Sequence, residues 1–245
     1  MLLFADMKLT VKEIKDEAKD TKTFIFDSEK RLNWLPGQYF YFTLPYLVQK
    51  DKRGPTRHFT ISTSPTEGDI QFTTRIRNSS GFKQTLKTLK KGDVLEGEGP
   101  NGTFVLNESE KGSHVFLAGG IGVTPARSII KYNFDKGLKD NRLHLIYSNS
   151  TPEEIAFRSE LEEKAKKAEN ITVDMTCSRV GESKEDWSGL TGRIDEVVIK
   201  KLVPDISKST FWLCGPPPMV DTLEKVLGKL KIATDKVRSE KFTGY

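Results

Sequence analysis

The stretch 116-FLAGGIGVTPARSII-130 reads as a buried strand, a sharp turn and the start of a helix. Gly119, Gly120 and Gly122 follow apolar residues, and Thr124-Pro125 opens a run of helical type. Backbone N–H groups and the positive end of a helix meet at such a turn, so the pattern predicts a phosphate-binding site. A tight turn without a ligand would look similar, and "GGIG" is not the GxGxxG dinucleotide fingerprint.

Before this stretch, the chain has the period of strands. Up to about residue 107, short alternating segments are separated by Gly, Pro, Asn and Asp, which predicts an antiparallel sandwich or β-barrel. The expected strands are 8–14, 21–27, 38–44, 58–63, 69–77 and 93–99. The segment 81–93 is the exception, since Phe82, Leu86 and Leu89 have helical spacing and predict a short helix.

After the polar stretch 107–113, apolar strands alternate with helices, which predicts an α/β domain with a parallel sheet covered on both faces. The expected strands are 114–119, 142–148, 171–177 and 210–215, and the expected helices are one from about Thr124, 152–168, 194–203 and 217–230. We therefore expect two domains, residues 1–108 and residues 109–245.

Composition narrows the class of protein. The 39 basic and 34 acidic residues are thoroughly mixed along 245 residues, so we expect no nucleic-acid binding and, at most, a mildly basic face for an acidic protein partner. The two cysteines, Cys177 and Cys214, form no disulfide framework, and the three histidines lack metal-ligand spacing. No protein-bound metal is expected.

The first residues lack the basic and apolar regions of a leader, and no apolar run approaches the roughly 18 residues of a membrane helix. We therefore expect a cytoplasmic protein without membrane insertion.

Polar residues and glycines gather at three expected strand ends of the second half. They are Gly119 to Gly122, Ser148 with the residues after it, and Cys214-Gly215-Pro216. Ligands bind beyond the carboxyl ends of parallel strands, so these residues predict a binding crevice.

The first half contributes 57-RHFTISTSP-65. Period-two geometry places Arg57 and Phe59 on one face and Thr60 on the other. A basic residue beside an aromatic one suits a ligand with a phosphate and a planar ring, although an ordinary strand has the same spacing. The helix start from Ser80 to Thr85 offers further N–H donors.

The order of these motifs, with "GPNGTF", "CGPPPM" and a terminal aromatic residue, resembles the ferredoxin–NADP⁺ reductase family of flavoproteins over essentially the whole chain. The resemblance implies a flavin-binding antiparallel β-barrel followed by an NAD(P)-binding α/β domain. It implies FAD as cofactor and transfer of a hydride from NAD(P)H to flavin N5. Electrons would then pass to a separate acceptor such as ferredoxin, flavodoxin, an oxygenase component, free flavin or a quinone. A non-catalytic flavin- or nucleotide-binding subunit is the alternative.

By this resemblance, Arg57 meets the FAD pyrophosphate, Phe59 packs on the flavin in place of the family's Tyr, and Thr60 bonds near N5. Lys83 stands where a hydroxyl is commoner. The flavin-binding residues implied by the resemblance are Arg57, His58, Phe59, Thr60, Ser80, Gly81, Phe82, Lys83 and Thr85.

For the nucleotide, the resemblance implies Gly119, Gly120, Gly122, Thr124, Pro125, Ser148, Ser178, Arg179, Cys214, Gly215, Pro216 and Met219. Ser178-Arg179 resembles a pair that contacts the NADPH 2′-phosphate, which favours NADPH slightly over NADH. Thr60, Cys214 and Tyr245 are the expected catalytic residues, with a buried small hydrophobe as the alternative for Cys214.

The tail 237–242 alternates like a strand and is expected at the edge of the parallel sheet. The resemblance implies that Tyr245 is a movable cover on the flavin, with Phe242 as second candidate and a frayed tail as the alternative.

Overall fold

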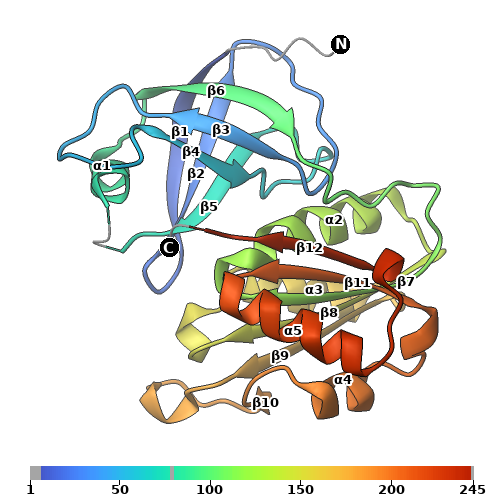
Figure 1. The fold of residues 1–245 in the computed structure, drawn as a ribbon. Helices are drawn as coiled ribbons and strands as arrows, with labels where there is room; N and C mark the ends of the chain where they lie inside the picture. The colour runs from blue at the N-terminus through green and yellow to red at the C-terminus, as the bar shows by residue number, and fades with distance from the viewer. Residues whose placement is uncertain (1–6, 78–79, 244–245) are drawn as a thin grey trace.

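The structure, a computed structural model, describes residues 7–77 and 80–243 of the chain. An antiparallel sheet of six strands is followed along the chain by a parallel sheet of six strands (Figure 1). The expected fold, a β-barrel domain followed by an α/β parallel-sheet domain, is confirmed. Within the described ranges, no helix is long and apolar enough to cross a membrane.

The first sheet is an incomplete barrel with two open edges. It consists of β1 (Met7–Ala18), β2 (Thr21–Ser28), β3 (Tyr39–Thr43), β4 (Thr56–Thr60), β5 (Ile70–Arg75) and β6 (Val94–Asn101), in the order β4-β3-β6-β1-β2-β5. The sheet curls until Phe59 of β4 stacks on Phe72 of β5, with ring centroids 4.4 Å apart. The edges β4 and β5 thus face each other across a seam without a hydrogen-bonded ladder, and α1 (Gly81–Thr88) follows β5 beside it.

Alternating apolar residues form the barrel core, as the sequence pattern predicts. Phe24 and Phe26 of β2 and Phe40 and Phe42 of β3 are fully buried, and Phe42 packs edge-on against Phe72 at 4.6 Å. Burial of each aromatic side chain removes a large apolar area from water, so this cluster holds the curled sheet in shape.

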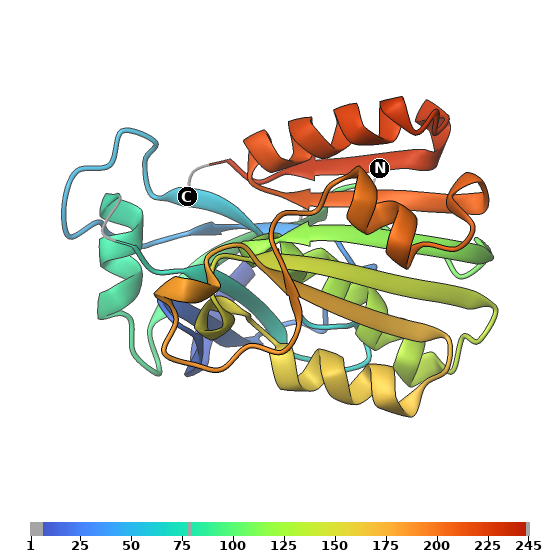
Figure 2. The ribbon, with the colours of Figure 1, turned by 90° about the horizontal axis from the view of Figure 1, so that it is seen from below.

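The second sheet consists of β7 (Gly112–Gly119), β8 (Asn141–Asn149), β9 (Ile171–Cys177), β10 (Leu190–Thr191), β11 (Ser209–Gly215) and β12 (Val237–Lys241), in the order β10-β9-β8-β7-β11-β12. Helices α2 (Val123–Lys136) and α3 (Arg158–Lys167) cover one face, and α4 (Glu196–Leu202) and α5 (Pro217–Lys229) cover the other (Figure 2). The strand order reverses between β7 and β11, and ligands bind beyond the carboxyl ends of strands at such a point.

The expected helix over 152–168 is wrong at its start. Residues 152–154 form a short 3-10 turn, Phe157 has φ 58°, and α3 begins only at Arg158. A contact with the first domain accounts for the late start of α3, because the Glu17 side chain accepts a hydrogen bond from the Phe157 backbone N–H at 3.0 Å. Phe157 is also buried against the sheet. The expected last strand is confirmed, since β12 pairs in parallel with β11.

Arg127 of α2 joins the two sheets. Its side chain is 7% exposed, and Nη1 donates to the backbone oxygen of Ser62, just after β4, at 2.9 Å. The guanidinium also donates to the carboxylates of Glu67 and Glu160 and lies over the ring of Phe157. One buried cation therefore connects the segment after β4 with α2 and α3.

Replacing Arg127 with Met should lower the free energy of unfolding by roughly 3–5 kcal/mol, because Glu67 would stay partly buried without its cation. Glu160 would keep only Lys164, whose Nζ lies 3.4 Å from its Oε1. Urea unfolding of the full chain measures this change. The exposed pair Lys167–Glu163 is the control, since Lys167→Ala should cost less than about 1 kcal/mol. Equal stabilities of the two variants would contradict this role for Arg127.

Candidate active site

Two cavities lie between and beyond the sheets. The first opens at the seam between β4 and β5. The second lies beyond the carboxyl ends of β7, β8 and β11. The predicted residues that line the first cavity are Arg57, His58, Phe59, Thr60, Ser80, Lys83 and Thr124. Those that line the second are Gly119, Gly120, Ser148, Ser178, Pro216 and Met219.

The remaining predicted residues line neither cavity. They are Gly81, Phe82, Thr85, Gly122, Pro125, Arg179, Cys214 and Gly215. Tyr245, the predicted flavin cover, lies outside the described residues. Phe242, the second candidate for that role, lines the first cavity together with Thr243.

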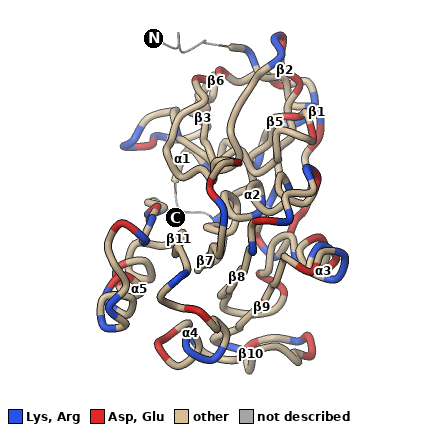
Figure 3. The backbone as a smooth tube through the Cα atoms, turned by 90° about the vertical axis from the view of Figure 1, so that its right-hand side faces the viewer, with Lys and Arg blue, Asp and Glu red and all other residues tan. Residues whose placement is uncertain are grey.

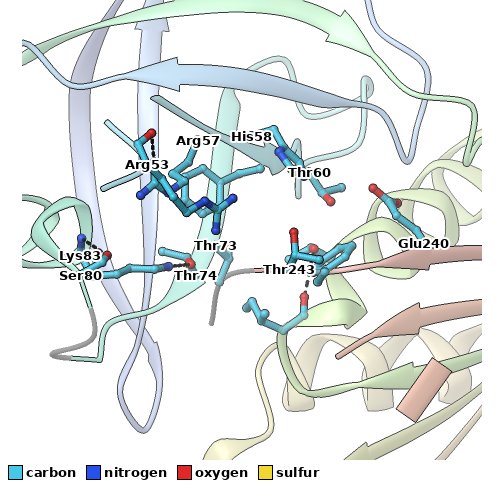
Figure 4. A pocket seen from close by; sticks show the side chains of 14 residues that line it. Arg53, Arg57, His58, Thr60, Thr73, Thr74, Ser80, Lys83, Glu240 and Thr243 are labelled. Carbon is cyan, nitrogen blue, oxygen red and sulfur yellow. Dashed lines mark hydrogen bonds between the residues drawn. The ribbon is translucent and has the colours of Figure 1, made fainter. Parts of the chain in front are cut away.

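The first cavity has a basic end and an acidic end. Lys83 and Ser80 lie at the α1 end with Arg57 beside them, whereas Thr60, His58 and Glu240 lie toward the parallel sheet (Figure 4). This charge separation suits a long ligand with an anionic portion near α1.

Arg57 is an anchored cation. Its Nη2 pairs with Asp51 Oδ1 at 2.7 Å, and its Nη1 donates to the backbone oxygens of Arg53, Gly54 and Thr56. Burial opposes the charge on Asp51, but hydrogen bonds from the N–H groups of Phe82 and Arg53 and from Arg57 lower its pKa to about 2. Arg57 and Asp51 thus hold the loop before β4 onto the start of α1.

Lys83 is a buried amine. The residue is 5% exposed, and its Nζ donates to Thr74 Oγ1 of β5 and lies 5.1 Å from the ring centroid of Phe59. Burial, and then the charge of Arg57, lower its pKa to about 7. Ser80 caps α1 by accepting from the Lys83 backbone N–H.

Three of the predicted flavin-binding residues shape the cavity from behind. Phe82 is fully buried in the barrel core under the Arg57 guanidinium. Thr85 donates to the backbone oxygen of Gly81 and accepts from the Val48 N–H, at 2.8 and 3.0 Å. A Cβ on Gly81 would overlap the backbone oxygen of Gln49. These residues pack the loop before β4 against α1.

Glu240 lines the first cavity but was missed by sequence reasoning. It lies on β12 opposite Cys214 of β11, and its Oε2 is buried without a hydrogen-bond partner among the described residues. Burial raises its pKa to about 7. The strand-like alternation of 237–242 could have marked it, but the register with β11 is a tertiary feature.

Cys214 is fully buried among apolar side chains between the sheet and α2. Burial raises the pKa of its thiol well above the usual value. These surroundings are those of a small core hydrophobe, and the expected catalytic role of Cys214 stays a prediction.

Close packing explains the glycines of the turn. A Cβ on Gly119 would overlap the sulfur of Met219 in α5, and one on Gly122 would lie 2.5 Å from the backbone oxygen of Cys214. Gly120 has φ +52° and faces the Arg75 guanidinium. The turn therefore lies directly against β11 and α5 and forms the floor between the two cavities.

The second cavity also contains Asn149, from the expected strand end at Ser148, and Arg193, which sequence reasoning missed. Asn149 is 5% exposed, and both atoms of its amide lack a hydrogen-bond partner within the described part of the chain. Arg193 lines the cavity, whereas the predicted Arg179 is half exposed and pairs with Glu182 at 3.1 Å. Arg193 follows Gly192, the first residue after β10, and no sequence motif marks it.

Both halves of the chain match known domain families. Residues 8–106 match the oxidoreductase FAD-binding domain, and residues 116–225 match the oxidoreductase NAD-binding domain.

Curated relatives include the glycine betaine monooxygenase reductase subunit of Chromohalobacter salexigens, 28% identical over 219 residues, which cover 88% of this chain and 58% of the relative. The ferredoxin–NADP reductase B of Sorangium cellulosum is 27% identical over 242 residues, which cover 95% of this chain and 91% of the relative. The chain thus spans little more than half the length of some of its relatives.

Solved structures share the fold. The cytochrome P450 reductase GcoB of Amycolatopsis has a TM-score of 0.84 at 22% identity, over 98% of this chain and 71% of that one. A ferredoxin NADP⁺ reductase from Neisseria gonorrhoeae, solved with bound FAD and NADP, has a TM-score of 0.78 at 18% identity, over 98% and 99%. The order of the two matched domains, the two sheets and these relatives together establish that the chain belongs to the ferredoxin–NADP⁺ reductase family of flavoproteins.

Proposed function

We propose that the protein is an FAD-dependent reductase that takes electrons from NAD(P)H and passes them to a separate acceptor. The shared wall of the two cavities carries this proposal. Gly119 and Gly120 line the second cavity, while Ile121 and Thr124 of the same turn line the first. Ligands in the two cavities would thus approach each other across one turn of the chain. We also propose the domain boundary between residues 108 and 109.

The residues of the first cavity fit a flavin nucleotide. At one end, a buried amine that pairs with no carboxylate of the described residues suits phosphates. At the other end, the Glu240 oxygen that has no hydrogen-bond partner among these residues suits a polar ring edge. Arg57 and Lys83 would hold the phosphates, and Phe59 and Thr60 would lie along the ring. Bound FAD supplies the redox chemistry, by accepting a hydride from the nicotinamide.

The residues of the second cavity fit the pyridine nucleotide. Ser148, Ser178 and the partnerless amide of Asn149 offer hydrogen bonds to ribose and phosphate oxygens. Arg193 is the cation that we assign to a 2′-phosphate, so the proposed preference for NADPH rests on Arg193 rather than on Arg179.

The proposed electron acceptor is an acidic protein. Lys and Arg are mixed with Asp and Glu over both domains (Figure 3). The loop before β4 carries three basic residues, Lys50, Lys52 and Arg53, and Arg53 lines the first cavity. An acidic surface docked on this loop would lie beside the proposed flavin site.

The first experiment tests the flavin itself. The purified protein should take up FAD, become yellow, and lose that colour when NADPH or NADH is added without oxygen. Absorption spectra under anaerobic conditions measure both steps. A protein that binds neither FAD nor FMN would contradict the proposed function.

The second experiment tests the choice of nucleotide. Arg193→Ala should raise the KM for NADPH roughly tenfold or more, because a charge-assisted contact with phosphate is worth about 1.5–3 kcal/mol. The KM for NADH should change far less. Arg179→Ala is the matched control, and a larger effect of that variant on NADPH would reassign the 2′-phosphate to Arg179.

The third experiment tests Glu240, which we propose holds a proton beside the reacting ends of both ligands. Burial raises its pKa from 4.5 to about 7, so the folded state binds more protons than the unfolded state between these values. Stability conferred by this proton is therefore complete below pH 4.5 and is lost as the pH rises to about 7.

The loss should amount to roughly 2–3 kcal/mol in the flavin-free protein. Urea unfolding at pH 5 and pH 8 should show a smaller difference for Glu240→Gln than for the wild type. Identical pH dependence of the two proteins would contradict a buried, titrating Glu240.

A further inference from the structure

Two cations of the first cavity, Arg57 and Lys83, are shielded from solvent and are neutralised differently, whereas Arg53 is exposed. Asp51 pairs with Arg57 at 2.7 Å, and backbone oxygens occupy the other nitrogen of that guanidinium. Lys83 has a hydroxyl and an aromatic ring as its neighbours, and no carboxylate of a described residue pairs with it. Of these two cations, Lys83 is therefore the one whose charge the protein itself leaves uncompensated.

Keeping a buried amine charged in such surroundings is unfavourable in free energy. Removing an ammonium group from water costs several kcal/mol unless a negative partner compensates it, and the group otherwise loses its proton. Lys83 is 5% exposed, and its pKa of about 7 places this exchange at neutral pH. A hydroxyl at this position could donate a hydrogen bond to a phosphate but could not change its charge.

We propose that Lys83 makes flavin binding proton-linked: its amine takes up a proton from solvent as it contacts the phosphates of the flavin nucleotide. The ammonium group then donates to phosphate oxygens, and no other bond is made or broken. This inference rests on the proposed flavin site and adds the coupling between phosphate recognition and pH.

The surroundings of Lys83 support this direction of coupling. The charge of Arg57 on β4 opposes a second positive charge at Lys83, and Asp51 is already compensated by Arg57. Arg53 also lines the cavity but is exposed to solvent. His58 and Glu240 also line the cavity, but they lie toward its other end (Figure 4). Thr74 Oγ1 of β5 keeps the Nζ of Lys83 at the cavity wall. The phosphates are then the negative groups that restore the charge of Lys83.

The test is a titration of the flavin-free full chain with FAD between about pH 6 and about pH 8.5, in buffers of different ionisation enthalpy. Above about pH 7 the Kd of the wild type should rise by up to about tenfold per pH unit, with uptake approaching one proton. Near pH 6, where Lys83 is already charged, uptake should be close to zero. Riboflavin, which lacks phosphate, should bind without proton uptake at any pH in this range.

Three variants identify the residue that takes up the proton when FAD binds. Lys83→Ser places a hydroxyl at the site and should make the Kd for FAD independent of pH above 7, whereas the exposed control Lys90→Ser should retain the linkage. Glu240→Gln removes the other buried titrating group of the cavity and should also retain it.

A wild type that binds FAD with no proton uptake at pH 8, or a Lys83→Ser variant that keeps the full linkage, would overturn the inference and leave the flavin site intact. A wild type that binds no flavin at any pH would overturn the proposed function and this inference together. The comparison of FAD with riboflavin needs only the wild type, so it decides the question even if Lys83→Ser does not fold.

Discussion

The buried guanidinium of Arg127 is the interaction on which the arrangement of the site depends. It connects the backbone just after β4, at Ser62, with Glu67 and with Glu160 of α3. Arg57 and Thr60 lie immediately before this connection on β4, and the glycine turn lies immediately before Arg127 on α2. Arg127 thereby fixes the position of the two walls of the first cavity relative to each other. Loss of Arg127 would leave the partly buried Glu67 without its cation and Glu160 with Lys164 alone, so this arrangement of the two sheets is strongly favoured.

Each sheet contributes a gap that its own topology creates. In the barrel, β4 and β5 are the unpaired edges, and their seam is open to a ligand. In the parallel sheet, the reversal of strand order between β7 and β11 leaves a crevice at the carboxyl ends of the strands. The turn at Gly119 and Gly120 separates the two openings, and its close packing on Cys214 and Met219 keeps the separating wall thin.

The charged residues of the first cavity differ in whether the protein supplies a partner for their charge. Arg57 is bound to Asp51 and shapes the loop before β4, whereas Lys83 is buried without such a partner. Glu240, at the other end, also lacks a partner for one oxygen. Burial shifts the pKa of both Lys83 and Glu240 to about 7, from opposite directions. Each end of the cavity therefore holds a buried group with a pKa near neutral pH.

Features that depend on local periodicity can be predicted from the amino-acid sequence. Spacing and turn residues alone predict the six alternating segments before residue 107, the glycine turn at 119–122 and a strand within 237–242. They also predict the order of the two domains. The positions at which distant segments of the chain come together depend on tertiary contacts. Hydrogen bonding to Glu17 delays α3 to Arg158, and the register of β12 on β11 places Glu240 beside Cys214 in the sheet. Likewise, the packing of β10 brings Arg193 rather than Arg179 to the second cavity. Register and burial arise from contacts between residues far apart in the chain, so no local pattern could specify them.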